Sequence, residues 1–193
     1  MRLLAEFKSV CKSFGESIII NDFSLKLEKG LKYAVMGESG SGKTTLLRIA
    51  AGLTAPDSGS FDHSGQIAVM FQEARLLPWK NALDNVRAVL AKEHFPLADK
   101  YLSEVGLDDA KDKLPRELSG GMAQRVSFAR LLAYAEATGA DLLLLDEPFS
   151  ALDDGTAEKM ISLLRKFSQD KTVLLVTHDE SDSEKFADHV IRL

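Results

Sequence analysis

Short apolar runs, each closed by glycine or polar residues, divide this sequence into candidate strands. Runs of this kind occur at residues 3–10, 18–20, 23–27, 31–36, 67–71, 142–145 and 174–176. The last three are apolar without alternation, which is typical of strands that are buried on both faces. The pattern therefore predicts a sheet whose central strands are covered on both sides.

Helical patterns fill most of the remaining chain. Helices are predicted at residues 43–51, 82–137 and 180–187, followed by a last strand at 190–193. The middle helical segment is interrupted near Pro96 and at Leu114-Pro115, because proline disfavours a continuous helix. Together these elements predict an α/β fold, in which helices wrap a mixed sheet and an all-helical subdomain is inserted in the middle.

The composition narrows the possible roles. With 193 residues, 45% hydrophobic and 27% charged, the chain has room for one domain with a sizeable core. Acidic residues outnumber basic ones, 29 to 24, which argues against nucleic-acid binding. A single cysteine indicates a reducing cytosol, the first residues predict no signal peptide, and the aliphatic runs are too short to span a membrane. Any role at a membrane would therefore need a partner.

The strongest motif is a phosphate-binding loop between a predicted strand and a predicted helix. It follows the pattern G-x-x-x-x-G-K-[ST] and consists of Gly37, Glu38, Ser39, Gly40, Ser41, Gly42, Lys43, Thr44 and Thr45. Its glycines let the backbone wrap around a phosphate, and the following helix adds its positive end. We expect Lys43 to reach the β- and γ-phosphates of a nucleotide and the Thr44 hydroxyl to bind Mg²⁺.

Two carboxylates follow the predicted strand at residues 142–145. Asp146 would bind Mg²⁺ at the carboxyl edge of the sheet, and Glu147 would act as a general base on the attacking water. Taken alone, such a pair is more often the solvated start of a loop. The phosphate loop in the same chain favours the functional interpretation.

A third motif, at the start of a predicted helix, consists of Ser119, Gly120 and Gly121. It offers accessible backbone N–H groups to an anion, although in isolation it would be interpreted as an ordinary helix cap. Together with the phosphate loop, the Asp146-Glu147 pair and Thr177-His178 after a further strand, it resembles the ATP-binding subunits of ABC transporters. The motifs occur in the right order, and the resemblance covers essentially the whole chain.

The resemblance implies the P-loop NTPase fold of ABC ATPases, with ATP and Mg²⁺ as cofactors. A small antiparallel β lobe would accompany the mixed sheet. Within a single domain, residues 1–74 and 138–193 would form the nucleotide-binding core and residues 75–137 the helical subdomain. Gln72 follows Lys43 by only 29 positions, which is short for the family, so we expect the β lobe to be trimmed. The short stretch after His178 leaves no room for a regulatory extension.

The resemblance also assigns roles by position. Residues implied in catalysis are Glu147 as the base, His178 as the switch histidine, Gln72 as the sensor of the γ-phosphate, and Lys43; residues implied in binding Mg²⁺ are Thr44, Gln72 and Asp146. Ser119, Gly120 and Gly121 would bind the γ-phosphate held by the opposite subunit of a dimer. Asp153 lies in a loop implied to reach across that dimer. Phe14 would stack on adenine, with a core phenylalanine at a strand end as the alternative.

Two local sequences depart from, or refine, the family pattern. Met122-Ala123-Gln124 stands where the commonest signature has glutamine directly after the glycines, but the Ser-Gly-Gly core is intact. Residues 71–79 closely resemble the same stretch in bacterial importers of nitrate, sulfonates, taurine and related solutes. In ABC importers this region accepts a short helix of the membrane subunit. Leu76, Leu77 and Trp79 therefore form either a partner surface or part of the core of the helical subdomain.

The function that this resemblance implies is ATP hydrolysis in a head-to-tail dimer that drives solute transport. The partners would be transmembrane permease subunits, a second copy of the chain when ATP is bound and, for an importer, a solute-binding protein. The chain would lie in the cytoplasm, peripheral to the membrane. Two alternatives are a soluble ABC ATPase, such as a clamp in iron–sulfur assembly, and a monomeric P-loop kinase or GTPase. The motifs at residues 119–121 and 150–153 count against the second alternative.

Overall fold

The computed structural model describes residues 2–38 and 40–193, and the chain divides into two compact units. Unit 1 contains the residues up to Val69, Asp141–Glu147 and Ser168–Leu193. Unit 2 contains Met70–Ala140 and Pro148–Phe167. Unit 1 is thus assembled from three separate stretches of sequence and unit 2 from two.

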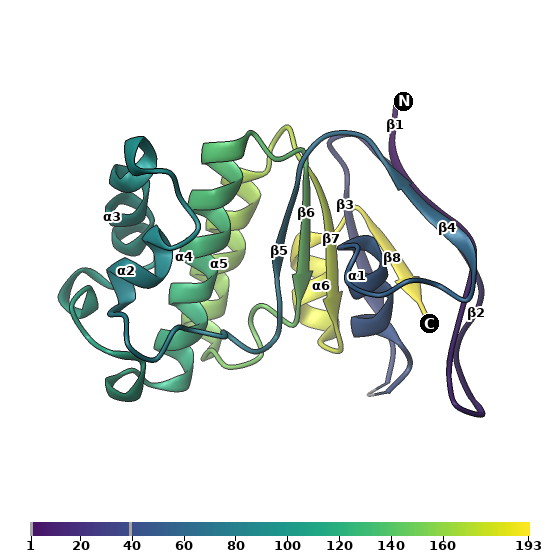
Figure 1. Cartoon of the computed structure of the whole chain (residues 1–193), viewed down its shortest axis with the longest axis horizontal. Helices are drawn as coiled ribbons and strands as arrows, with labels where there is room; N and C mark the ends of the chain where they lie inside the picture. Colours follow the sequence, from purple (N-terminus) through teal and green to yellow (C-terminus); the bar gives the residue numbers. More distant parts are fainter. Residues whose placement is uncertain (1, 39) are drawn as a thin grey trace. The chain divides into compact units, whose positions relative to one another are not determined.

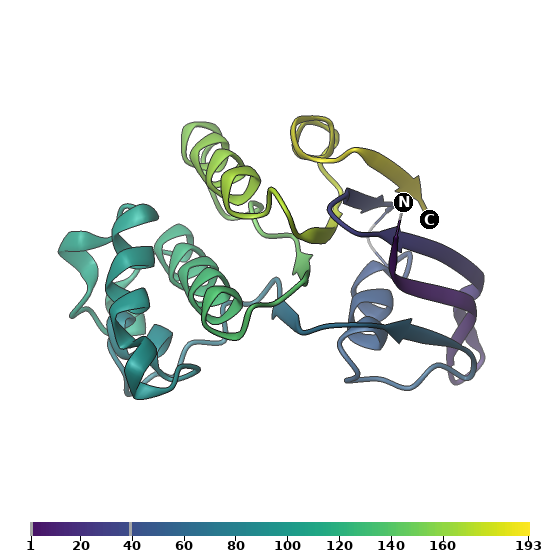
Figure 2. The same ribbon diagram turned by 90° about the horizontal axis from the view of Figure 1, so that it is seen from above.

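Unit 1 is built on a five-stranded sheet (Figure 1). The strand order is β5-β6-β7-β3-β8, and the strands span Ile67–Met70, Leu142–Asp146, Thr172–Thr177, Lys32–Met36 and His189–Arg192. The pairs among β6, β7, β3 and β8 are parallel. Every residue of β6 and β7 is buried, which confirms the predicted burial on both faces for these two strands. The same prediction is wrong for residues 67–71, because β5 is an edge strand whose residues alternate between partly exposed and buried. Helices α1 (Lys43–Ala50) and α6 (Glu180–Phe186) cover opposite faces of this sheet (Figure 2).

A separate three-stranded sheet, in the order β2-β1-β4, is antiparallel and forms the small β lobe. Its strands span Ser17–Glu28, Leu3–Phe14 and Ser58–His63. The fully buried ring of Phe7 packs against Phe23 and Phe61, at centroid distances of 5.5 and 4.4 Å. These aromatic contacts give the lobe its own apolar centre.

The sheet differs from the sequence prediction at two places. The runs at 18–20 and 23–27 predict separate strands, but both belong to β2. The residues between them form an irregularity within the strand, where Asp22 has a φ of 48° and the register against β1 shifts. β4 is missed by the hydrophobic pattern because its side chains are mostly polar and none is fully buried.

Unit 2 is helical. Its helices are α2 (Ala82–Arg87), α3 (Phe95–Glu104), α4 (Gly120–Thr138) and α5 (Asp154–Phe167), with short 3₁₀ turns at Lys92–His94, Asp108–Ala110 and Pro115–Glu117. The predicted helical character of residues 82–137 is confirmed. Pro96 lies in the first turn of α3, and Pro115 lies in the break between α3 and α4.

The boundary between the units differs from the expected one at α5. The resemblance places all of residues 138–193 in the nucleotide-binding core, whereas Pro148–Phe167 groups with the helices. Phe149 packs on Phe128 of α4 and Phe167 on Tyr101 of α3, at centroid distances of 6.3 and 5.8 Å. These contacts join residues far apart in the chain, so a local apolar pattern does not reveal them.

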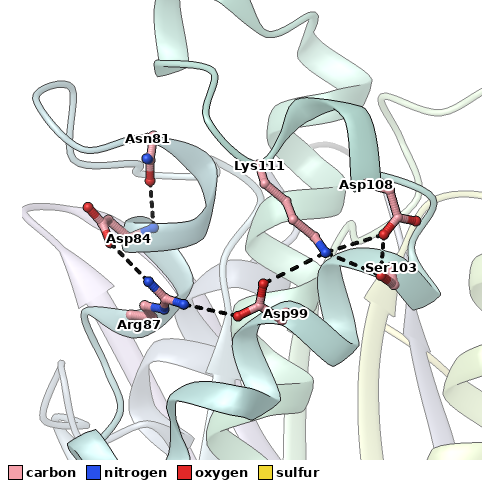
Figure 3. Close-up of polar contacts among 7 residues, drawn as sticks. All are labelled: Asn81, Asp84, Arg87, Asp99, Ser103, Asp108 and Lys111. Atoms are coloured by element: carbon pink, nitrogen blue, oxygen red, sulfur yellow. Dashed lines mark hydrogen bonds and ion pairs between the residues drawn. The ribbon is translucent and has the colours of Figure 1, made fainter.

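Polar contacts join α2, α3 and the segment that leads to α4 (Figure 3). Asp99 on α3 lies 3.0 Å from the Arg87 guanidinium and 3.7 Å from Lys111 Nζ. The residues of this network are Asn81, Asp84, Arg87, Asp99, Ser103, Asp108 and Lys111. Exposed ion pairs contribute little to stability one by one, but a carboxylate shared by two cations restricts the positions of three segments.

Candidate functional site

The site in unit 1 forms where three neighbouring parallel strands end. Met36, the last residue of β3, pairs with Thr177 of β7, and Asp146, the last residue of β6, pairs with Val176. The carboxyl ends of parallel strands meet at one edge of a sheet, which is where open α/β sheets bind ligands. The residues that follow these strands therefore emerge side by side.

The loop after β3 has the backbone that its glycines predict. Gly40 and Gly42 adopt left-handed conformations, with φ of 86° and 96°. A Cβ on Gly42 would lie 2.8 Å from the carbonyl oxygen of Ile19, so only glycine fits at this position. Gly42 also directly precedes the first turn of α1 and thereby sets the angle at which the loop enters the helix.

Lys43, the first residue of α1, lies across this loop. Its side chain is buried, and Nζ donates to the carbonyl oxygens of Gly37 and Glu38 at 2.7 and 2.8 Å. The ammonium group is thus held inside the curve of the loop, where a bound phosphate would meet it. Ser39 lies outside the described residues.

Asp146 provides a desolvated carboxylate beside the loop. Asp146 is only 1% exposed, and this burial raises the pKa of its carboxyl group. The Thr44 hydroxyl, which donates a hydrogen bond to the carboxylate, and the nearby positive charge of Lys43 both lower that pKa. Oδ1 is buried and has no hydrogen-bond partner among residues 2–38 and 40–193. An unpaired buried carboxylate oxygen next to a hydroxyl is a donor set that suits Mg²⁺, which takes hard oxygen ligands.

Glu147 and His178 form a polar pair at the ends of β6 and β7. His178 Nδ1 lies 2.7 Å from Glu147 Oε1, and the Thr177 hydroxyl lies 3.5 Å from Oε2. The hydrogen bond and the negative charge of Glu147 raise the pKa of the His178 imidazole above its ordinary value. Glu147 has a φ of 46°, and a non-glycine residue in this region is strained and is found most often at functional sites.

The exposure of these two side chains differs. The Glu147 side chain is 9% exposed and that of His178 is 64% exposed. The carboxylate is therefore fixed by its surroundings, while the imidazole faces solvent. A carboxylate held in this way is able to accept a proton from a water molecule, and the imidazole is able to orient it.

The structure brings Lys43, Thr44, Asp146, Glu147 and His178 together in unit 1. Phe14, also in unit 1, is 56% exposed at the end of β1 and is therefore not a core residue. Lys12 Nζ lies 5.4 Å from the centre of its ring and 2.6 Å from Asp57, an arrangement that the sequence did not indicate.

The remaining predicted residues belong to unit 2. Gln72 is exposed in the segment after β5. Ser119 caps α4, accepting from the Met122 N–H at 3.2 Å, and both Ser119 and Gly120 are exposed at the start of this 19-residue helix. An open helix start of this kind presents backbone N–H groups to an anion.

Two other positions in unit 2 have local structural partners. Asp153 caps α5, because its two carboxylate oxygens accept from the N–H and the hydroxyl of Thr156 at 3.0 and 2.8 Å. These hydrogen bonds lower the pKa of the Asp153 carboxyl. Trp79 is 73% exposed and is therefore not a core residue of the helical subdomain.

The fold and the site define a class. A glycine-rich loop between a strand and a helix, with a buried carboxylate at the end of a nearby parallel strand, characterises the P-loop nucleoside triphosphatases. The comparison with known sequences extends this result: the family described as "ABC transporter" matches residues 20–150, and the chain belongs to this family.

Curated relatives match almost the whole chain. The aliphatic sulfonates import ATP-binding protein SsuB of Corynebacterium glutamicum is 45% identical, with 98% of this chain and 79% of that protein covered. SsuB 1 of Paracoccus denitrificans is 40% identical over 96% of this chain and 77% of that protein, and SsuB of Escherichia coli K12 is 41% identical over 95% and 74%.

Solved structures agree with the sequence comparison. A dimeric bacterial ABC transporter cassette superimposes with a TM-score of 0.88 and 31% identity, over 98% of this chain and 94% of that one. A dimeric post-hydrolysis cassette that is bound to ADP and Pi gives a TM-score of 0.86, also at 31% identity, over the same shares of the two chains.

The chain is thus an ATP-hydrolysing subunit of the ABC transporter class. The family membership sets aside the kinase and GTPase alternative, and the relatives favour transport over a soluble ABC clamp. Within residues 2–38 and 40–193, no helix is both long enough and apolar enough to cross a membrane.

Proposed function

We propose that unit 1 binds ATP with Mg²⁺ and hydrolyses it with Glu147 as the general base. The observation that carries this proposal is the contact between the buried Glu147 carboxylate and the exposed His178 imidazole, 2.7 Å apart, with Glu147 directly following the desolvated Asp146. A base must be held within reach of its proton, and the fixed Glu147 carboxylate meets that requirement. His178 orients the carboxylate through Nδ1 and faces the solvent on its other side.

The phosphate loop supplies binding. Lys43 Nζ exchanges its contacts with the Gly37 and Glu38 carbonyl oxygens for phosphate oxygens, and the loop amides surround the same phosphate. Thr44 and Asp146 would hold Mg²⁺ through the hydroxyl and the unpaired Oδ1. When bound, the cation neutralises charge on the β- and γ-phosphates. Gln72 keeps the role that its place after β5 implies, as a further ligand and a sensor of the γ-phosphate.

A second copy of the chain completes the site. Ser119, Gly120 and Gly121 of that copy would bind the γ-phosphate, which fits the exposed start of α4. The exposed ring of Phe14 would stack on adenine, and the cation beside it at Lys12 would reinforce its position. Asp153 would contribute across the dimer through the loop that it ends, with its carboxylate fixed as the cap of α5.

We further propose that the transporter is an importer of small sulfonates, with a solute-binding protein as a third component. The names of the relatives and the sequence of residues 71–79 support this assignment. Trp79 is exposed in the same segment and would contact the permease on the cytoplasmic face of the membrane.

The experiment is transport by the reconstituted complex of this chain, its permease and the binding protein in proteoliposomes. ATP enclosed with the chain should drive uptake of a labelled sulfonate such as taurine, and a Glu147→Gln complex should not. Uptake of nitrate in preference to sulfonates would replace the cargo assignment while leaving the ATPase assignment intact. Hydrolysis that does not depend on the permease or the binding protein would contradict the proposed coupling.

A further inference from the structure

The segment between β5 and α2 is held by a buried asparagine. Asn85 on α2 is fully buried, and its Oδ1 accepts from the Leu77 N–H at 2.6 Å. Its Nδ2 donates to the carbonyl oxygens of Leu77, Lys80 and Asn81 at 3.2, 2.9 and 3.0 Å. One side chain therefore serves four backbone groups of a single turn, which leaves that turn little freedom.

The preceding part of the segment is held by an arginine. Arg130 on α4 donates to the carbonyl oxygens of Ala74 and Arg75 at 2.6 and 3.3 Å, and to the Ser127 hydroxyl at 3.3 Å. Burial lowers the pKa of this guanidinium, so its hydrogen bonds replace water that it has lost. Arg75 has a φ of 44°, a strained conformation that persists only where the surroundings impose it.

The hydrogen bonds of Asn85 and Arg130 hold the backbone near an exposed tryptophan. Trp79 lies within the turn that Asn85 holds, and its side chain is 73% exposed. The turn continues into α2, whose first N–H groups, at Ala82 and Leu83, donate to the carbonyl oxygens of Lys113 and Lys111. Lys111 is in turn part of the ionic network of unit 2 (Figure 3). The backbone around Trp79 is thus tied to α4 and to the segment that leads to α4.

We propose that Asn85 and Arg130 are positioning residues that keep residues 74–81 in one shape before the permease docks. The inference rests on the proposed function, in which Trp79 contacts the permease. Ordering a loop on binding costs free energy, and a surface that is already ordered avoids that cost. A fixed surface also transmits a displacement of the permease to α4, the helix that Ser119 caps, whereas a loose loop would absorb it.

Two conservative variants test the roles. Arg130→Lys keeps the charge but replaces the planar fork of donors with a single ammonium, which cannot reach both carbonyl oxygens in the same geometry. Asn85→Asp keeps the shape of the side chain, but an ionised aspartate has no donor for the three carbonyl oxygens. The second variant keeps the test decisive if the first one does not fold.

The chain offers a matched control on the same helix. Arg125 on α4 donates to the carbonyl oxygens of Val105 and Gly106 at 2.9 and 3.2 Å, which repeats the chemistry of Arg130 on a different loop. Arg125→Lys therefore removes the same kind of contact without touching residues 74–81. A general effect of weakening α4 would appear in both variants.

Trp79 also supplies the measurement, because it is the one tryptophan in the sequence. In the isolated full chain, Arg130→Lys and Asn85→Asp should add a fast component to the decay of Trp79 fluorescence anisotropy, on the nanosecond scale of loop motion. Amide hydrogen exchange at residues 74–81 should quicken about tenfold or more. Arg125→Lys should leave both measurements at the values of the parent chain. Anisotropy and exchange unchanged in folded Arg130→Lys and Asn85→Asp chains would overturn the inference.

A second measurement separates this inference from the proposed function. In the reconstituted complex, a loosened loop should reduce the permease-dependent part of ATP hydrolysis, while ATP binding to unit 1 stays the same. Loosening without any loss of stimulation would overturn the link between loop order and coupling. If Trp79→Ala leaves stimulation unchanged, the assigned permease contact is wrong, but the anisotropy results for Asn85 and Arg130 still decide the inference about loop order.

Discussion

At the residue scale, the proposed mechanism assigns the base to a glutamate that the fold holds in a strained conformation. Glu147 has a φ of 46° and a nearly buried side chain, and Asp146 beside it is more deeply buried still. The two neighbouring carboxylates have different surroundings: Asp146 contacts Thr44 and Glu147 contacts His178. This difference allows one carboxylate to act as a metal ligand and the other as a base.

Replacing the base should abolish turnover and spare binding. Glu147→Gln removes the proton acceptor but keeps the size of the side chain, so hydrolysis should fall by about 10²–10⁴ while ATP still binds. Single-turnover hydrolysis and equilibrium binding of a fluorescent ATP analogue would measure the two effects. Lys43→Ala is the complementary variant and should weaken binding, because it removes the buried ammonium from the loop. Turnover of Glu147→Gln within a few-fold of the parent would remove Glu147 from the role of base.

The same variant should change the titration of His178. Glu147 raises the pKa of His178 above the ordinary value of 6.5, so Glu147→Gln should lower it towards that value. Any stability that this pair contributes is complete below the ordinary pKa and is lost as the pH rises through the raised one. Titration of the histidine ring protons by NMR in the nucleotide-free chain would show the shift. A His178 pKa equal in both proteins would mean that the pair is not formed in solution.

At the element scale, the buried strands β6 and β7 hold the site in place. Both strands are buried along their whole length, and each ends in residues of the site. Because these strands are packed on both faces, loss of apolar volume within them leaves a cavity. Such a cavity lowers stability and also loosens the residues that follow the strand.

Shortening a buried side chain in β6 should therefore destabilise the protein. Leu144 is fully buried, and Leu144→Ala should lower the free energy of unfolding by about 2–5 kcal/mol. Leu53, which is 58% exposed, provides the control, since Leu53→Ala should change the free energy of unfolding by less than about 0.5 kcal/mol. Urea denaturation followed by circular dichroism would measure both. Equal effects of the two substitutions would contradict the assignment of β6 to the core.

At the scale of the whole molecule, the proposed mechanism has one chain carry two halves of an ATP site. Unit 1 carries the phosphate loop and unit 2 the exposed start of α4. In a two-fold dimer each surface meets its complement on the other copy, so two sites form together. Each copy has a formal charge of −5, which opposes association when no nucleotide bridges the copies.

Dimerisation should accordingly follow ATP and not ADP. Glu147→Gln should hold ATP with greatly slowed hydrolysis, so its sedimentation equilibrium should show a dimer with ATP and a monomer with ADP. Adding Ser119→Arg should block the dimer by placing bulk at the start of α4, while ATP binding by a single chain persists. A Glu147→Gln chain that stays monomeric at saturating ATP would leave two explanations. Repeating the run with the permease bound would separate a need for the membrane partner from a failure of the shared-site mechanism.

The sequence by itself determined the elements and the motifs whose signals are local. The apolar runs located β3, β6 and β7, and the spacing of Gly37, Gly42, Lys43 and Thr44 located the phosphate loop, because a tight turn before a helix needs those residue types in that order. Ser119 was predicted as a helix cap on the same grounds, and it caps α4.

Only the tertiary structure decided which distant side chains meet. Glu147 and His178 are 31 positions apart, and their contact follows from the parallel pairing of β6 with β7. Asn85 gives no signal in the sequence, because a buried asparagine is recognised only by the backbone groups that it serves. The hydrogen bonds of Arg130 and the grouping of α5 with the helices of unit 2 likewise give no signal in the local sequence. Periodicity records which face of an element is apolar, whereas the partner of a buried polar group is set by packing between elements.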